Sequence, residues 1–308
     1  MILCCGEALI DMLPRQATTG EAAFAPHAGG AVFNTAIALG RLGAPAGFFS
    51  GIAEDFMGQI LADTLVASKV DTTYIRRAAR PSTLAFVQLL DGQARYAFYD
   101  VGTAGRMLSE ADLPDLSDAV STLFFGGISL VGDPCGATYE ALMLREAARR
   151  VTMIDPNIRP GFITDEGAYR ARLARMIAAA DIVKLSDEDL HWLEGPGEIE
   201  PLARKILGRG PKLVLITEGA AGAHGFTAEL SVFCPARKVT VADTVGAGDT
   251  FNAGALAALD RDGVLTKAAL GVLSTDRLRT ALDLGIAAAA VTVSRPGANP
   301  PWAHELSA

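Results

Sequence analysis

Residues 241–256 contain the clearest combination of residue types that could do chemistry. Gly246, Ala247 and Gly248 end an extended segment, and Asp249 follows them in the first turn of an apolar helix. Because tiny residues let the chain bend sharply, a ligand can reach the backbone N–H groups at this point. The unpaired N–H groups of a first helical turn, together with the positive end of the helix dipole, favour a bound anion.

Two explanations of Asp249 are open on the residues alone. Asp at the start of a helix is favoured simply because it caps free N–H groups. An anion site with a carboxylate on its rim, however, has the parts needed for phosphoryl transfer. The amides stabilise charge on the transferred group, and the carboxylate accepts the proton of an attacking hydroxyl. A cap would not need three consecutive tiny residues before it, which favours the chemical explanation.

The elements that must position this segment alternate along the chain. Short apolar runs without polar alternation are typical of strands that are buried on both faces of a parallel sheet. Such runs cover residues 2–5, 46–51, 123–125, 151–154, 182–185 and 213–216, and helical patterns cover residues 33–42, 55–68, 137–150, 168–179 and 199–207. This alternation predicts an α/β fold, a three-layer sandwich with a mostly parallel central sheet.

Two stretches depart from that alternation. Residues 83–90 and 95–99 flank Asp91-Gly92, which is a strong hairpin signal, and residues 223–226 and 230–233 predict a second hairpin. The first hairpin lies outside the strand–helix order, so we expect it to form a small sheet over one edge of the main body. A surface hairpin without a role is the alternative.

Composition excludes several classes of protein. The chain has 308 residues, of which 50% are apolar, and a net charge of 27 − 35 = −8. It can bury a large core, and its charge argues against binding to a nucleic-acid backbone. Four Cys and 4 His are too few and too scattered for a disulfide scaffold or a structural zinc site. The N-terminus lacks a basic leader, and no run of 18 uncharged apolar residues occurs, so we expect a cytoplasmic protein without a membrane partner.

Residues 243–249, Asp-Thr-Val-Gly-Ala-Gly-Asp, match the DTxGAGD signature of the ribokinase-like sugar kinases, also called the phosphofructokinase-B family. The resemblance extends over nearly the whole chain, in matching order. Further similar segments are Gly6-Glu7 with Asp11, Gly29-Gly30 with Asn34, residues 38–43, Gly51 with Asp55 and Gly58, Asp155-Pro-Asn-Ile-Arg159, and Thr217-Glu-Gly-Ala-Ala-Gly222. The resemblance implies one kinase domain over residues 1–308, with a β-sheet lid from about residues 9–27 and 72–105. A dehydrogenase is disfavoured because no GxGxxG follows the first strand, and a Walker loop because the chain has no Gly-Lys pair.

The same resemblance implies roles for individual residues. Asp249 would be the catalytic base, and Gly246, Ala247 and Gly248 would form the anion hole with it. The sugar would be held by Asp11, Gly29, Gly30, Asn34 and Phe98, with Arg159 meeting the triphosphate or the sugar. The nucleotide would meet Lys184, Thr217, Gly219, Gly222 and Asn252, with residues 287–291 as one wall of the adenine slot unless they only pack against a neighbouring helix.

The expected metal is Mg²⁺, bound with ATP, the co-substrate. The family commonly carries an NxxE motif whose Glu organises the metal through water, but here Ser186 replaces the Asn and Asp189 falls at the Glu position. Asp189 could still hold a hydrated Mg²⁺, or Asp187 or Glu188 could replace it. An acidic helix N-terminus without a metal role is the alternative. The resemblance also allows a monovalent cation, K⁺, near Asp243 and residues 294–297.

Residues 96–106 favour one substrate among those of the family. They resemble the fructokinase branch, in which a lid aromatic packs over the sugar. Tyr96 and Phe98 share one strand face, and Tyr99 on the other face could support a homodimer through the lid. We therefore expect ATP-dependent phosphorylation of fructose to fructose 6-phosphate, a small-molecule reaction. Ribokinase activity remains an alternative. So does 2-keto-3-deoxygluconate kinase activity, because Arg106 could bind the carboxylate of an acidic sugar. A non-catalytic sugar- or nucleotide-binding regulator is a third alternative.

Overall fold

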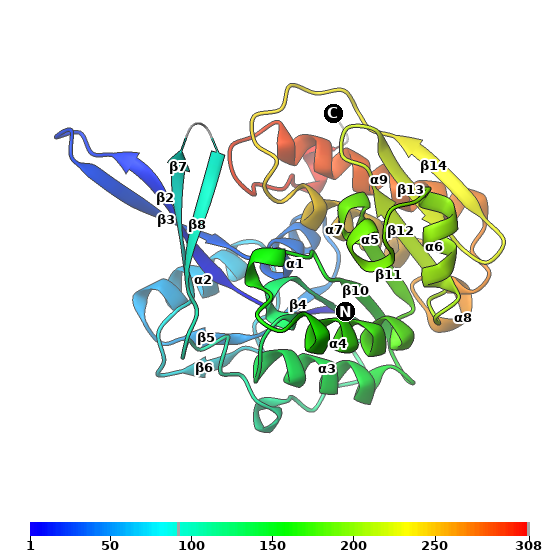
Figure 1. Ribbon diagram of the computed structural model, residues 1–308, viewed down its shortest axis with the longest axis horizontal. Coiled ribbons are helices and arrows are strands. Elements are labelled where there is room, and N and C mark those ends of the chain that lie inside the picture. Colours follow the sequence, from blue (N-terminus) through cyan, green and yellow to red (C-terminus); the bar gives the residue numbers. More distant parts are fainter. Residues whose placement is uncertain (91–92, 307–308) are drawn as a thin grey trace.

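A computed structural model of the protein describes residues 1–90 and 93–306. Its main sheet has eight strands, and the first six in spatial order from β4 pair in parallel (Figure 1). The spatial order is β14 (Ser231–Pro235), β13 (Gly222–Phe226), β12 (Leu213–Thr217), β11 (Ile182–Ser186), β10 (Val151–Asp155), β9 (Thr122–Gly126), β1 (Ile2–Cys5) and β4 (Ala46–Phe49). Strands β13 and β14 continue the sheet in antiparallel pairing.

Helices cover both faces of this sheet because successive side chains of its strands point to opposite sides. In β1, Ile2 and Cys4 belong to one apolar cluster and Leu3 and Cys5 to the other. The first cluster packs against α1 (Ala31–Arg41), α2 (Phe56–Ala67), α7 (Ala247–Arg261), α8 (Lys267–Leu270) and α9 (Thr275–Val293). The second packs against α3 (Cys135–Glu146), α4 (Glu166–Ala179), α5 (Asp187–Glu194) and α6 (Ile199–Leu207). The predicted three-layer α/β sandwich is therefore confirmed.

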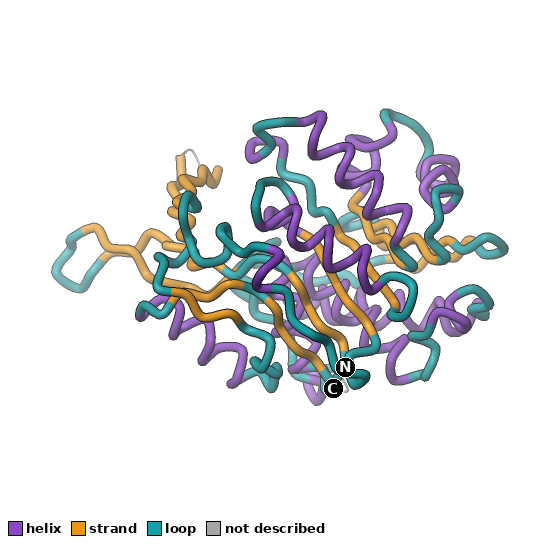
Figure 2. Tube along the Cα trace, turned by 90° about the horizontal axis from the view of Figure 1, so that it is seen from below, coloured by secondary structure: helices purple, strands orange, loops and turns teal. Residues whose placement is uncertain are grey.

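A separate four-stranded sheet stands over one edge of the main body. Its order is β3 (Ala22–Gly29), β2 (Leu9–Gln16), β7 (Leu84–Leu90) and β8 (Gln93–Tyr99). Both views show β2 and β3 projecting away from the helices (Figures 1 and 2). The antiparallel β7–β8 pair confirms the first predicted hairpin, although its Asp91-Gly92 turn lies outside the described residues and the side chain of Tyr96 is not described.

Two boundaries differ from the sequence-based expectations in ways that the contacts explain. The run at 46–51 is split at Ser50, because the Ser50 carbonyl accepts from Arg76 N (2.9 Å) and β5 (Gly51–Ala53) leaves the main sheet to pair with β6 (Arg76–Ala78). Helix α3 ends at Glu146, not at residue 150, because the chain must turn to enter β10 at Val151. The second predicted hairpin, β13–β14, is present, and it extends the main sheet.

Of the helices in the described ranges, none combines the length and the apolar character that a bilayer crossing requires. All four Cys are free and buried.

Candidate active site

The bend before α7 leaves backbone N–H groups facing a cleft. Gly246 caps the helix with a φ of 78°, a left-handed conformation that favours glycine, and no side chain bonds to this helix end. An added Cβ at Gly246 would lie 2.8 Å from the Cβ of Ala298. Residues 244–249 all line the cleft, which has a volume of about 620 Å³. The uncapped first turn of α7 is therefore available to an anion.

Asp249 lies in this first turn and faces the same cleft. Asn34 Nδ2, from α1, donates to Asp249 Oδ2 at 2.9 Å, and Thr35 Oγ1 donates to the Asp249 carbonyl at 3.2 Å. The carboxylate thus bonds to another helix and not to the N–H groups of its own, so capping does not explain this residue. Burial raises the pKa of Asp249 to about 7, against the lowering effect of the Asn34 hydrogen bond. A carboxylate with a pKa near neutrality suits a general base.

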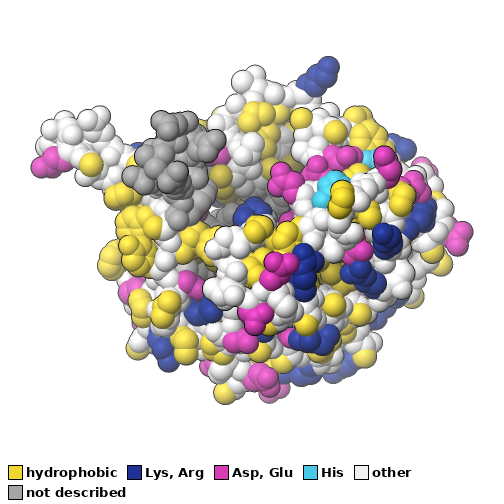
Figure 3. Space-filling view, in the orientation of Figure 1, with side chains coloured by type: hydrophobic (Ala, Val, Ile, Leu, Met, Phe, Trp, Pro, Cys, Tyr) yellow, Lys and Arg dark blue, Asp and Glu magenta, His cyan; other side chains and the backbone are white. Residues whose placement is uncertain are grey.

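The cleft lies where the parallel strands end, as expected for a sheet of this kind. Space-filling shows a hollow between the small sheet and the main body (Figure 3). Predicted residues that line it are Asp11, Gly30, Asn34, Phe98, Arg159, Lys184, Asp189, Thr217, Gly219 and residues 246–249. The structure thus brings together most of the predicted site from seven separate parts of the chain.

Gly29 and Asn252 lie behind that surface. An added Cβ at Gly29 would lie 2.4 Å from Asp11 Oδ2, so this glycine leaves space for the Asp11 carboxylate. Asn252 is buried beneath the cleft, where its Nδ2 donates to Asp155 Oδ2 at 2.6 Å. Both residues therefore support groups of the site from behind.

Asp155 was expected only as part of a motif, and the structure gives it a central place. It ends β10, and Lys184 Nζ on the neighbouring β11 lies 3.1 Å from the same Oδ2 that Asn252 contacts. Lys184 Nζ also lies 3.1 Å from the position that a Cβ on Gly248 would take. The ion pair therefore places a buried cation beside the anion-binding turn. The sequence signal that could have predicted this ion pair is an Asp at the end of one buried strand and a Lys within the next.

The end of the cleft beside the small sheet, where the sequence predicts that the sugar binds, carries an acid and aromatic rings. Burial raises the pKa of Asp11, on β2, to about 6. Phe98, on β8, packs its ring edge-to-face on Phe162 of the short helix η3 (Pro160–Phe162), with centroids 4.3 Å apart. The small sheet and the main body therefore meet across the cleft. Arg159 is exposed at the rim, where its Nη1 donates to the Ile158 carbonyl at 3.0 Å.

A second, mostly apolar cleft of about 480 Å³ adjoins the first and shares Thr217, Gly219, Thr244, Ala247 and Gly248 with it. Gly222, Phe251, Ala289, Ala290 and Val293 line its apolar part, and Arg237 and Lys238 add two cations that sequence reasoning missed. Of residues 287–291, Ala289 and Ala290 line this cleft, whereas Ala287 and Ala288 are buried in the core. That the cleft takes adenine stays a prediction. The clefts meet at the N-terminus of α7, as a phosphate-bearing nucleotide would require.

The carboxylates of the two predicted metal residues, Asp189 and Asp243, accept hydrogen bonds from backbone N–H groups in this structure. Asp189 accepts from Ile158 N (2.9 Å) and Ser186 N (3.2 Å), and Ser186 Oγ accepts from Asp189 N (3.0 Å), a capping box at the start of α5. Asp243 lies outside both clefts, where it accepts from Val245 N (3.0 Å) and Gly297 N (2.9 Å). Within residues 1–90 and 93–306, no three His, Cys, Asp or Glu side chains cluster as metal ligands.

Comparison with known proteins agrees with this geometry. A fructokinase from Rhizobium leguminosarum bv. trifolii is 60% identical over 283 residues, which are 92% of this chain and 87% of the relative. The structure of a fructokinase from Xylella fastidiosa with bound ATP superimposes with a TM-score of 0.89 at 29% identity, covering 99% of this chain and 97% of that one. An engineered fructokinase from Vibrio cholerae O395, bound to fructose, ADP and potassium ion, has the same fold (TM-score 0.84, 24% identity, 96% and 93% coverage).

The family relation covers almost every residue. The model of the pfkB family of carbohydrate kinases matches residues 1–305, which include all three sheets and every residue of the two clefts. The chain therefore belongs to the pfkB family of carbohydrate kinases.

Proposed function

We propose that this kinase transfers the γ-phosphoryl group of ATP to the C6 hydroxyl of fructose. The observation that carries the proposal is the position of Asp249, which lines the large cleft next to Gly248, a residue that both clefts share. Asp249 lies in a first helical turn without a side-chain cap, and Asn34 orients its carboxylate. The fructokinase that is 60% identical to this chain over 283 residues supports fructose as the acceptor.

The chemistry follows from the groups at that junction. Asp249 takes the proton of the sugar hydroxyl, and the resulting oxygen forms a bond to the γ-phosphorus as the bond to the ADP oxygen breaks. The N–H groups of the turn at 246–249 and the ammonium of Lys184 stabilise the charge on the transferred group. Asp11 and Asn34, whose polar atoms face the sugar end, hold hydroxyls of the substrate.

Mg²⁺ is proposed as the partner of ATP. When bound, it neutralises charge on the phosphate oxygens. Since both oxygens of Asp189 already accept N–H groups, Asp187 and Glu188 on the rim of the cleft join it as candidates to hold the hydrated ion. K⁺ is proposed near Asp243 and residues 294–297, with the potassium-bound fructokinase from Vibrio cholerae as support.

The contacts of Arg106 favour fructose over an acidic sugar. Arg106, the residue left open for a carboxylate, is paired with Asp100 (3.2 Å), donates to the Asp133 carbonyl (3.0 Å) and does not line the large cleft. The described rim offers the single exposed cation Arg159 to an acid at the sugar end. A 2-keto-3-deoxygluconate kinase is therefore disfavoured.

The small sheet is proposed as a lid and as a dimer surface. Its inner face carries Asp11 and Phe98, and its outer face carries an aromatic row of Phe24, Phe86 and Tyr99, with ring centroids 5.1 and 5.6 Å apart. Phe24 and Tyr99 are 48% and 62% exposed. A second copy of this sheet is an apolar partner of matching shape. The cytoplasm is the proposed location because it supplies ATP.

The test is ADP release measured with fructose, ribose, 2-keto-3-deoxygluconate and a nucleoside. We expect the highest kcat/KM with fructose, and Asp249→Asn should lower kcat by ~10²–10⁴-fold while ATP still binds. Asp260→Asn, at the other end of α7, is the matched control and should keep wild-type turnover. No ADP release with any sugar, together with sugar or nucleotide binding, would support the non-catalytic regulator instead.

A further inference from the structure

Glu7 is a buried acid to which neither the family resemblance nor the proposed chemistry gives a role. It follows β1, is 9% exposed and lines the large cleft. Its Oε1 accepts from Ala31 N at 2.8 Å, and its Oε2 accepts from Ser129 N at 3.3 Å. These N–H groups stabilise the charged carboxylate and lower the pKa of Glu7, against burial, which raises it. One side chain thus joins α1 to the short helix η2 (Gly127–Leu130).

The backbone around Glu7 is shaped to admit its carboxylate. Gly127 has a φ of 67°, and a Cβ there would lie 2.1 Å from Glu7 Oε1. Gly30 has a φ of 110°, and its Cβ would lie 3.0 Å from the Glu7 carbonyl oxygen. Both glycines line the cleft. A side chain at Gly127 is excluded because the carboxylate occupies its place, so Glu7 and the cleft wall fit each other.

Helix α1 carries the effect of Glu7 to the base. Gly30 is the N-cap of α1 and has no side chain, so the Glu7 carboxylate supplies the cap from another part of the chain. One turn later, Asn34 donates to Asp249 Oδ2 at 2.9 Å, and Thr35 bonds to the Asp249 carbonyl. Two hydrogen-bonded steps therefore connect Glu7 to the carboxylate that accepts the proton.

We propose that Glu7 is a positioning residue for phosphoryl transfer: it fixes the first turn of α1, and through Asn34 the orientation of Asp249. The proposal rests on the proposed kinase function. It assigns Glu7 no contact with the reacting atoms.

The charge of Glu7 affects the pKa of Asp249, which the pH dependence of activity measures and which simple loosening of the fold would not lower. The charged groups that face Asp249 are Asp155 from β10, Lys184 from β11 and Glu7; of these, Asp155 and Glu7 raise the pKa of Asp249 and Lys184 lowers it. Glu7 in turn faces Cys135 and Tyr139 of α3, and Asp100 and Arg106 across a small cavity. Removing the Glu7 charge should therefore lower the pKa of Asp249.

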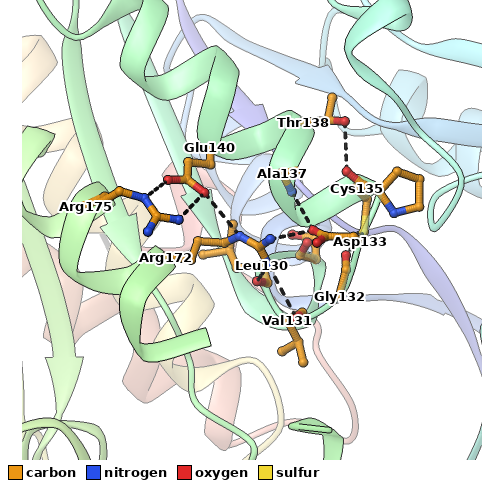
Figure 4. A network of polar contacts seen from close by, with 12 residues as sticks. Leu130, Val131, Gly132, Asp133, Cys135, Ala137, Thr138, Glu140, Arg172 and Arg175 are labelled. Carbon is orange, nitrogen blue, oxygen red and sulfur yellow. Dashed lines mark hydrogen bonds and ion pairs between the residues drawn. The ribbon is translucent and has the colours of Figure 1, made fainter. Parts of the chain in front are cut away.

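The far end of η2 offers a matched control (Figure 4). Arg172 of α4 donates to the Leu130 carbonyl (2.9 Å) and pairs with Asp133 and with Glu140 of α3, which also pairs with Arg175. Glu140 is as buried as Glu7, at 9% exposed, and anchors the same segment through Arg172. It does not line the large cleft. Glu140→Gln thus makes the same chemical change away from Asp249.

The experiment measures kcat and kcat/KM for fructose against pH in the wild type, E7Q, E140Q and E7D, with melting temperatures. For E7Q we expect kcat to fall about tenfold or more, because Asp249 loses its orientation. The acid limb of its pH profile should lie at lower pH than that of E7D, because only E7Q loses the Glu7 charge that raises the pKa of Asp249. E140Q should keep the wild-type limb. E7D keeps the charge but reaches less far, so kcat should fall and the acid limb should move to higher pH, because the Asn34 hydrogen bond that lowers the pKa of Asp249 is weakened.

The outcomes separate this inference from the proposed function. If the wild type does not phosphorylate fructose, the proposed function fails, and the series is run on the sugar that the panel identifies. If the wild type is active and E7Q keeps its kcat, or loses kcat only in parallel with E140Q and with the same limb as E7D, Glu7 is structural and the proposal is overturned. Should E7Q not fold, a wild-type kcat in E7D overturns it.

Discussion

Asp249 is subject to two opposing influences, and their balance sets the pH at which it can work as a base. Burial raises its pKa to about 7, whereas the hydrogen bond from Asn34 stabilises the charged form and lowers it. A base must be deprotonated, so activity is lost as pH falls below the pKa. We expect kcat/KM to rise with pH through about 7 and then to level off.

Asn34→Ala tests the assignment of that limb. The substitution removes the hydrogen bond that favours the carboxylate, so the limb should move to higher pH and kcat/KM at pH 7 should fall about tenfold. The measurement is the same pH series. Thr64→Ala on helix α2 controls for the loss of a polar side chain from a helix. A limb that stays in place in Asn34→Ala would assign the titration to another group.

Lys184 and Asp155 form a pair whose members should depend on each other. Both side chains are almost fully buried, at 5% and 3% exposed. Lys184→Met leaves the Asp155 carboxylate without its cation, and we expect the free energy of unfolding to fall by about 3 kcal/mol. Asp155→Asn with Lys184→Met removes both charges and should restore part of that loss but not the turnover. Urea unfolding and ADP release measure the two effects, and additive losses would contradict the coupling.

Residues of this site were predictable where they belong to a local sequence motif. They were not predictable where their role comes from contacts with residues far away in the sequence. Asp249 and its glycines stand together in the sequence, so their chemistry could be predicted locally. Glu7 meets Ala31 and Ser129, partners 24 and 122 residues away, and no local pattern indicates that contact. Asp189 shows the converse, because its acidic context fits a metal or a helix cap and only the contacts to backbone N–H groups indicate the cap.

At the scale of elements, the first turn of α7 depends on the absence of side chains at Gly248. A Cβ there would lie 3.1 Å from Lys184 Nζ, so Gly248→Ala fills the space between the cation and the transferred phosphate. We expect kcat to fall about a hundredfold while the melting temperature changes little, since Ala is favoured over Gly in a helix. Gly167→Ala, at the equivalent second position of α4, is the matched control and should be fully active. Equal activity of the two variants would remove Gly248 from the anion site.

Strands and helices were predictable where burial is uniform, and their ends were not. The run at residues 213–216 is uniformly apolar, and β12 covers it with one further residue, Thr217. The pattern at 137–150 continues past the end of α3, but Arg150 bonds to the distant Leu116 carbonyl (3.0 Å), and β10 begins at the next residue. Helix boundaries therefore followed the position of the next strand, which no local propensity encodes.

At the scale of the molecule, the exposed aromatic row on the small sheet should determine the oligomeric state. Phe24 and Tyr99 are large, exposed and joined by Phe86 into one apolar surface. We expect a dimer in sedimentation velocity that Phe24→Ser with Tyr99→Ser converts to a monomer. Val272→Ser, at a residue that is 82% exposed outside this sheet, is the control and should leave the dimer intact. A monomeric wild type at micromolar concentration would contradict the lid–lid dimer.

The lid should also keep water from the phosphoryl group, and Phe98 is the residue through which this can be tested. Its ring meets Phe162 of the main body across the cleft, so removing it opens the sugar end. A closed site excludes water as a competing acceptor. Phe98→Ala should therefore raise the KM for fructose about tenfold and increase the share of ATP that is hydrolysed without sugar phosphorylation. Phe86→Ala removes a ring from the outer face of the same sheet and controls for loosening of the strands. Measuring ADP and fructose 6-phosphate together gives the coupling ratio. If that ratio in Phe98→Ala equals that in Phe86→Ala, the small sheet does not act as a lid, because opening the sugar end would then have admitted no water.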